Sequence, residues 1–342
     1  MRRKRFLWVG ALAAGATAAV MGMVASGDTG AASAAPGVTP TRVGLVSDVG
    51  RFNDRSFNQS ALEGLQRARR QLGVQTRALE SRQNSDYIPN LARLARDRFS
   101  PISVGFLLAD ATNTAAEQFP NTRFAIIDYS VRVPPFHRNR NVRGLTFATN
   151  ENSYMIGCLA ALMARRAGGR VISAVGGIKL PTVDIFIAGY RAGAKRCVRG
   201  TTVLINYSQD FVAQDKCKEL ALNQIERGSR VIFQVAGGCG LGALDAARER
   251  GRWGIGVVKD QKNLGRHILT SAVKRVDQSV FLTARALKNG TFRGGTDAVF
   301  NLKNAGVAVG RIDARVPRAF IRRMNALRPL IISKRIRPPR TL

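Results

Sequence analysis

The chain is poor in histidine, cysteine and acidic residues. Its 342 residues include 2 His, 4 Cys and 22 Asp plus Glu, against 54 Lys plus Arg, which gives a formal net charge of +32. His137 and His267 stand in unrelated contexts, so neither a Ser-His-Asp arrangement nor a metal-ligand cluster is visible. The sequence therefore predicts no metal, no cofactor and no enzymatic activity.

The four cysteines are too few for a disulfide scaffold. In an exported protein Cys197 and Cys217 could pair, although four cysteines allow three connectivities. Cys158 stands in the apolar helical stretch IGCLAALMA and is interpreted as a buried thiol. The sequence alone thus leaves the disulfide state open.

The excess of lysine and arginine indicates affinity for polyanions or a solvated cationic surface. These residues are spread along the chain without interleaved aromatic residues, so no specific nucleic-acid platform is expected. The segment 311–342 differs, since it holds ten Lys or Arg and one acid, Asp313. For this basic C-terminal segment we expect loose contact with anionic envelope polymers.

The first 35 residues are typical of an export signal. Basic residues 2–5 precede an apolar run from Phe6 to about Ala25, and small residues near 32–34 offer a cleavage site. An uncleaved membrane anchor is the alternative, which the Ala/Gly-rich run disfavours. We therefore expect an exported, extracytoplasmic protein with a short linker at 36–40.

Beyond the linker, strand and helix patterns alternate at the spacing of βαβ units. In the first series we expect strands at 42–47, 74–79, 102–108, 123–128 and 142–147, and helices at 57–72, 88–98, 111–118 and 151–167. In the second we expect strands at 170–175, 201–206, 230–235, 254–258 and 267–272, with helices at 183–196, 214–227, 241–250 and 275–288. Two short apolar runs at 298–302 and 306–309 and a terminal helix near 316–332 follow. Two such series without a long linker predict an α/β protein whose two lobes close over a cleft about a hinge.

The turn after the first strand is rich in ligand-binding groups. It carries carboxylates, amides and an aromatic ring: Asp48, Asn53, Asp54, Phe57 and Asn58. Small ligands bind at the carboxyl ends of parallel strands, next to helix N-termini. Ser56 followed by Gln59 also predicts a capping box at the helix start. This turn therefore predicts a site for a small, polar, ring-bearing ligand.

Several motifs that together are highly specific lie between about Thr41 and Ile336. They are SDVGRFNDRSFNQSALEGL, GFLLADA, FAIID, LTFATNENSYMIGCLAALMA, VGGIKLPTVDIFIAGYRAGAK, VAGGCGLGALDAARERG and SAVKRVDQSV. Together they resemble the basic-membrane-protein family of solute-binding proteins, which includes purine-nucleoside-binding lipoproteins of ABC importers. The resemblance implies a type I periplasmic-binding-protein fold with two Rossmann-like lobes, a hinge and an interlobe cleft. We expect a first lobe at 41–147, completed by about 268–305, and a second at 148–267 with part of 306–342.

The resemblance also implies the site residues. The expected ligand-binding residues are Asp48, Phe57, Asn58, Asp110, Phe211, Gly237, Gly238 and Lys274. Among them, Asp110 would pair with a purine edge and Lys274 would reach the ribose. Phe57 and Phe211 would sandwich a flat ring, worth roughly 1–3 kcal/mol per stacked base.

Structural roles are the alternative for most of these positions. Asp48 could cap the turn after its strand, and Asp110 could cap the helix that follows it. Gly237 and Gly238 could instead allow the two lobes to pack closely. Asp128 and Glu151, near a lobe crossing, are interpreted as hinge or ion-pair residues.

One position departs from the family pattern. The family reads G-V-D-x-D-Q where residues 256–261 read GVVKDQ, so Val258 replaces a ribose-binding Asp. A hydrogen bond to a charged group contributes roughly 1.5–3 kcal/mol. Lys259 would bring a positive charge nearby instead. No cysteine near the cleavage site offers a lipid anchor.

We therefore predict an extracytoplasmic solute-binding protein of an ABC importer. Its ligand would be a purine nucleoside or a related small molecule, and its partner a membrane permease. The alternatives are an extracellular sensor subunit without transport, an enzyme acting on nucleosides, and a basic structural protein of the envelope.

Overall fold

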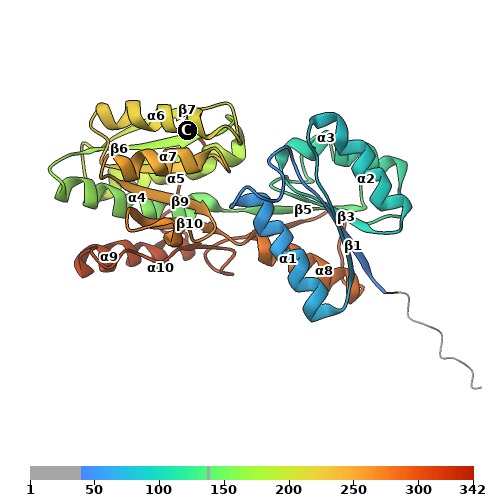
Figure 1. Ribbon diagram of the computed structural model, residues 1–342. Helices are drawn as coiled ribbons and strands as arrows, with labels where there is room; N and C mark the ends of the chain where they lie inside the picture. The colour runs from blue at the N-terminus through green and yellow to red at the C-terminus, as the bar shows by residue number, and fades with distance from the viewer. Residues whose placement is uncertain (1–39, 137–138) are drawn as a thin grey trace, which may run out of the picture. The chain divides into compact units, whose positions relative to one another are not determined.

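Two six-stranded sheets, each flanked by helices, make up the fold (Figure 1). The computed structural model describes residues 40–136 and 139–342, so the predicted export signal and His137 lie outside it. The strand orders are β11-β5-β4-β3-β1-β2 and β12-β10-β9-β8-β6-β7. We call the first sheet with its helices the first lobe and the second sheet with its helices the second lobe.

The first lobe alternates strands and helices from the start of the described chain. Its elements are β1 (Arg42–Val46), α1 (Phe57–Leu72), β2 (Gln75–Leu79), η1 (Asn84–Asp86), α2 (Tyr87–Arg96), β3 (Ser100–Ser103), η2 (Phe106–Leu108), α3 (Ala109–Gln118), β4 (Phe124–Ile127), β5 (Val142–Phe147), α8 (Val276–Lys288) and β11 (Asp297–Phe300). The strand pairs in this sheet are all parallel, as expected for βαβ units.

The second lobe repeats this plan. Its elements are α4 (Thr149–Arg166), β6 (Val171–Gly176), α5 (Pro181–Cys197), β7 (Thr202–Tyr207), α6 (Gln214–Glu226), β8 (Val231–Val235), α7 (Gly240–Glu249), β9 (Trp253–Val258), η3 (Lys262–Leu264), β10 (Ile268–Lys274), β12 (Val307–Val309), α9 (Arg318–Asn325) and α10 (Leu327–Ile332). Only β12 runs antiparallel to its neighbour in the described part of this sheet.

The chain passes between the lobes three times, near Ala148, at Arg275 and through residues 301–306. The expected return to the first lobe at about residue 268 is wrong. Ile268–Lys274 forms β10, which pairs in parallel with β9 of the second lobe. The return therefore begins with α8, and both lobes contain segments that are distant in sequence.

Alternating side chains of the strands divide each core between two sheet faces. In β1, Val43 and Leu45 belong to the core under α1 and α8, whereas Val46 belongs to the core under α2 and α3. In the second lobe, small residues let α4 and α5 pack backbone against backbone. A Cβ atom on Gly157 or Gly193 would come within 2.0 or 1.8 Å of a carbonyl oxygen of the facing helix.

Two predicted elements differ in the structure. The expected strand at 102–108 ends at Ser103, because Gly105 adopts a φ of 117° and the 3₁₀ helix η2 follows. The expected terminal helix is two helices, α9 and α10, joined at Ala326. Pro329 has no N–H to donate to the carbonyl four residues earlier, so a continuous helix would lose a hydrogen bond there.

Both disulfides differ from the sequence interpretation. Cys158 is bonded to Cys197, which joins α4 to the end of α5, and Cys217 is bonded to Cys239, which joins α6 to the start of α7. The close approach of α4 and α5 brings the Cα atoms of the first pair to 5.1 Å, within the usual range for a disulfide. Cys158 is therefore not a free thiol, and Cys197 does not pair with Cys217.

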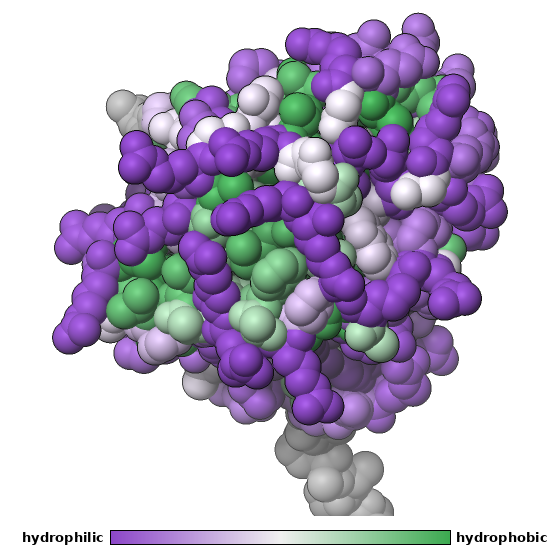
Figure 2. All heavy atoms as spheres, turned by 90° about the vertical axis from the view of Figure 1, so that its left-hand side faces the viewer, coloured by the Kyte–Doolittle hydropathy of each residue, from purple (hydrophilic) through white to green (hydrophobic). Residues whose placement is uncertain are grey.

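One face of the molecule, shown in Figure 2, is largely hydrophilic. Long hydrophilic side chains project there between apolar patches. Across the described ranges, no helix combines the length and the apolar composition that a membrane crossing requires.

We predict that the Cys158–Cys197 bond stabilises the second lobe. A bond closing a loop of this length contributes about 2–4 kcal/mol. The double variant Cys158→Ala/Cys197→Ala should therefore lose about that much free energy of unfolding in urea titrations. Reductant should also lower the unfolding midpoint of the wild type, because it cleaves this bond together with Cys217–Cys239. Unchanged midpoints for the variant and for reduced wild type would contradict the prediction.

Candidate functional site

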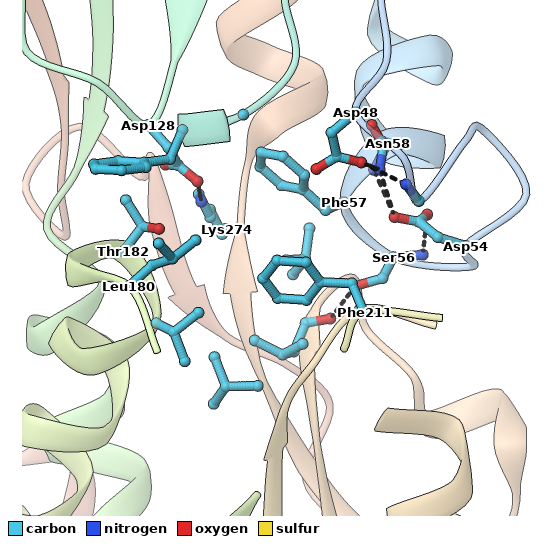
Figure 3. Close-up of a pocket in the computed structure, with 18 of the residues that line it drawn as sticks. Asp48, Asp54, Ser56, Phe57, Asn58, Asp128, Leu180, Thr182, Phe211 and Lys274 are labelled. Carbon is cyan, nitrogen blue, oxygen red and sulfur yellow. Dashed lines mark hydrogen bonds and ion pairs between the residues drawn. The ribbon is translucent and has the colours of Figure 1, made fainter. Parts of the chain in front are cut away.

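A cavity lies between the two lobes, lined from both (Figure 3). From the first lobe the lining residues are Asp48, Gly50, Asp54, Ser56, Phe57, Asn58, Gly105, Phe106, Leu107 and Asp128. From the second lobe they are Leu180, Thr182, Val183, Phe186, Phe211, Val235, Gly237, Val257, Val258 and Lys274. The first-lobe wall is thus rich in carboxylates, whereas most of the second-lobe wall is apolar.

Asp54 fixes the start of α1. Its carboxylate accepts hydrogen bonds from the backbone N–H groups of Ser56, Asn58 and Gln59, at 2.8–3.1 Å. The predicted capping box is therefore wrong: Ser56 makes no side-chain cap. Burial raises the pKa of Asp54, and these hydrogen bonds oppose that shift.

Asp48 and Asn58 line the first-lobe side of the cavity and are hydrogen-bonded to each other. The Asn58 amide Nδ2 donates to Asp48 Oδ1 at 2.8 Å and to Asp54 Oδ2 at 3.2 Å. Asp48 Oδ1 also accepts from the backbone N–H of Gly50, so Asp48 caps its turn as well. The Oδ1 atom of Asn58 is buried and has no partner among the described residues. Burial, with smaller contributions from the Asp54 and Asp128 carboxylates, raises the pKa of Asp48 to about 6.

Phe211 is held in the second-lobe wall by the glycine loop. The N–H of Cys239 donates to the carbonyl of Phe211 at 2.9 Å, and Gly237, at a φ of 56°, lies against the same residue. Phe57 and Phe211 both border the cavity, one above the other in Figure 3. The structure therefore gives Gly237 a packing role behind a cavity-lining ring.

Lys274 and Asp128 form an ion pair across the two lobes. Lys274 ends β10, Asp128 follows β4, and the Lys274 side chain is 3% exposed. Its ammonium also lies 4.6 and 4.9 Å from the ring centroids of Phe57 and Phe147. Burial lowers the pKa of Lys274, and Asp128 opposes that shift.

Of the eight expected site residues, six line this cavity: Asp48, Phe57, Asn58, Phe211, Gly237 and Lys274. Gly238 lines a neighbouring hollow instead. Asp110 is exposed in the first turn of α3 and is not part of the cavity lining, because η2 turns the chain before it. Lys259 does not line the cavity either and pairs with Glu63 of α1 at 2.5 Å.

Sequence reasoning missed the contribution of α5 and the loop before it. Leu180, Thr182, Val183 and Phe186 line the cavity from this segment. They follow β6, so the rule that ligands meet the carboxyl ends of strands could have identified them. Val258, the departure noted in the sequence, lines the cavity with a φ of 64°.

We predict that Asp48→Asn stabilises the ligand-free protein at neutral pH. A carboxyl whose pKa is raised on folding stabilises the folded state fully at pH values below its unfolded pKa, near 4. This contribution is lost as the pH rises through the folded pKa, about 6. The asparagine lacks this titration and keeps an acceptor for Asn58. Relative to wild type, the variant should gain up to about 3 kcal/mol between pH 4 and 7 in urea titrations.

Asp215→Asn, an exposed acid in the first turn of α6, is the matched control. It should show no comparable gain across this pH range. Parallel pH profiles of Asp48→Asn and wild type would refute the burial argument.

Comparisons with known proteins agree with this geometry. Residues 41–341 match the family model described as ABC transporter substrate-binding protein PnrA-like. A Lactococcus lactis protein named ABC transporter nucleoside-binding protein BmpA is 33% identical over 334 residues, covering 90% of this chain and 92% of its own length. Basic membrane protein A of Borreliella afzelii is 31% identical, covering 92% and 94%.

A solved structure shares the fold. A solute-binding protein of an ABC transporter system from Aeropyrum pernix superimposes with a TM-score of 0.79 at 24% identity, covering 88% of this chain and 94% of that one. The two parallel-sheet lobes, the cavity between them and the family match over nearly all described residues lead to one conclusion. The chain belongs to the Bmp family of PnrA-like ABC transporter substrate-binding proteins.

Proposed function

We propose that the interlobe cavity binds a purine nucleoside or a related ring-bearing compound for delivery to an ABC permease. The observation that carries this proposal is the pair of aromatic side chains, Phe57 and Phe211, contributed to one cavity by opposite lobes. Stacking on such rings is worth roughly 1–3 kcal/mol per base and tolerates any flat heterocycle.

The first-lobe wall supplies hydrogen-bond acceptors beside these rings. Asp48 and Asn58 both line the cavity, and the Oδ1 atom of Asn58 is buried without a partner among the described residues. A ring edge with two N–H donors, such as that of guanine or an aminopurine, would satisfy both acceptors. An unsatisfied buried acceptor costs about 1–3 kcal/mol, so ligands without such donors are disfavoured.

Contacts across the cleft support a closing motion about the crossings. Lys259 of the second lobe pairs with Glu63 of the first, and Ser56 Oγ lies 3.5 Å from the carbonyl oxygen of Val257. Both contacts would break as the lobes separate. A ligand that touches both walls would therefore favour the closed form, which is the form a permease would recognise.

We propose that the protein binds its ligand outside the cytoplasm. The N-terminal signal pattern supports export, and the basic segment 311–342 would contact anionic envelope polymers loosely. A sensor subunit without transport would need the same cavity and would differ only in its membrane partner.

We predict that inosine, guanosine or adenosine stabilises the mature protein in thermal-shift assays. A ligand at a hundredfold excess over its Kd adds about 2.7 kcal/mol. Phe57→Ala and Phe211→Ala should each weaken binding roughly 5- to 150-fold in calorimetry, since each removes one stacking face.

Phe320→Ala is the control, because Phe320 is a half-buried phenylalanine of α9 outside the cavity. It should leave affinity unchanged. Stabilisation by simple sugars alone, with no response to any nucleoside or free base, would rule the ring proposal out.

A further inference from the structure

A second hollow, distinct from the one that Gly238 lines, adjoins the ligand cavity. Both lobes line it, and Arg340 joins them from the segment after α10. Four of its lining residues also line the ligand cavity: Phe106, Asp128, Thr182 and Lys274. The Asp128–Lys274 ion pair therefore stands in the wall that the two spaces share.

The two spaces differ in size. The ligand cavity offers about 80 Å³, room for roughly six water-sized groups. The second hollow offers about 370 Å³. The second hollow therefore has room for a substituent beyond a flat ring.

Three residues that carry hydrogen-bond donors line this hollow: Thr149, Lys274 and Arg340. Thr149 is 1% exposed, and its Oγ1 atom is buried without a partner among the described residues. The ammonium of Lys274 has three N–H donors and is bonded to one carboxylate, that of Asp128. Arg340 adds a guanidinium group from the segment after α10.

The one acid in the lining of this hollow is already paired. Lys274 neutralises Asp128, whereas the Ser130 and Tyr129 hydroxyls donate outside the hollow, to Asp297 at 2.6 Å and to the carbonyl of Pro134 at 2.5 Å. With Lys274 and Arg340 against Asp128, the lining carries one excess positive charge. These groups suit an anionic acceptor.

The position of Arg340 is set by a buried anchor. The Asn150 amide Nδ2 donates to the carbonyl of Pro338 at 2.7 Å, and Asn150 is 4% exposed at the start of α4. The segment after α10 is thereby held at the first lobe crossing. Two residues further on, Arg340 reaches the hollow.

We propose that this hollow is an anion subsite that takes the carboxylate or phosphate of a small organic molecule. Phe147, Pro181 and Ile185 line it beside the donors, so an apolar stem would pack there while the anionic group meets Thr149, Lys274 and Arg340. The anion would be either a substituent of the cleft ligand or a separate small molecule. In the first case the subsite proposal rests on the proposed function.

The test compares calorimetric affinities of inosine and inosine 5′-monophosphate for the full chain, with inorganic phosphate and benzoate measured alone. In wild type the monophosphate should bind at least tenfold tighter than the nucleoside. Arg340→Gln should remove most of that advantage, and Thr149→Val should reduce it severalfold without lowering the melting temperature of the ligand-free protein. Arg337→Gln, an exposed arginine of the same segment outside the hollow, should keep it.

The outcomes distinguish a separate anion from an anionic substituent of the cleft ligand, and two of them overturn the proposal. If phosphate or benzoate alone stabilises wild type but not Arg340→Gln, the subsite holds a separate anion, even where no nucleoside binds and the proposed function fails. If the monophosphate has no advantage and neither free anion stabilises the protein, the subsite proposal is overturned. The proposal would also be overturned if Arg337→Gln and Arg340→Gln lost the affinity advantage of the monophosphate to the same extent, because equal losses would indicate general charge attraction.

Discussion

The buried ion pair between Lys274 and Asp128 is the constraint on which the site depends. It joins the end of β10 in the second lobe to the loop after β4 in the first. Removing two charges from water is costly, and their attraction offsets that cost only with good geometry and additional contacts. Here the faces of Phe57, Phe147 and Phe186 surround the ammonium and provide cation–π attraction.

This pair also determines how the walls of the cleft are divided. Asp128 is bonded to Lys274 and Asp54 to the backbone of α1, whereas the hydrogen bonds of Asp48 to described residues all go to one oxygen, Oδ1. The opposite wall is largely apolar around Val257 and Val258. Val258 adopts a φ of 64°, which is unusual for a β-branched residue and favours Asn or Asp among residues with side chains. A hydroxyl facing Val258 would find no side-chain partner there, so a sugar would need its hydrogen bonds from the Asp128–Lys274 side.

Much of the fold was predictable, because hydrophobic periodicity determines where long elements lie. The expected helix at 57–72 and strand at 142–147 match α1 and β5. Errors fall where one residue overrides the pattern: Gly105 ends a strand, Pro329 divides a helix, and Asp54 caps a helix in place of Ser56.

The site was predictable where side chains directly follow strands, as for Asp48. Asp110 is not part of the cavity lining, since the turn of η2 separates it from its strand and it lies exposed in α3. The pairing of Cys158 with Cys197 depends on helix packing, which spacing alone does not fix. Thr149 and Arg340 are 191 positions apart in the chain and line the same hollow, where the anchor between Asn150 and Pro338 holds the C-terminal segment.

The charge of the molecule and the charge of its cavity act in opposite directions. A net charge of +32 creates a positive field that repels cations and concentrates anions near the surface. The cavity contains three carboxylates, of which Asp128 is paired with a cation, and burial raises the pKa of Asp48 to about 6, so Asp48 is mostly ionised at pH 7. The acids therefore offer hydrogen-bond acceptors and leave the cavity with negative charge at neutral pH. The acceptors favour a ligand whose ring carries N–H donors, whereas the positive surface field disfavours a cation that the carboxylates alone would attract.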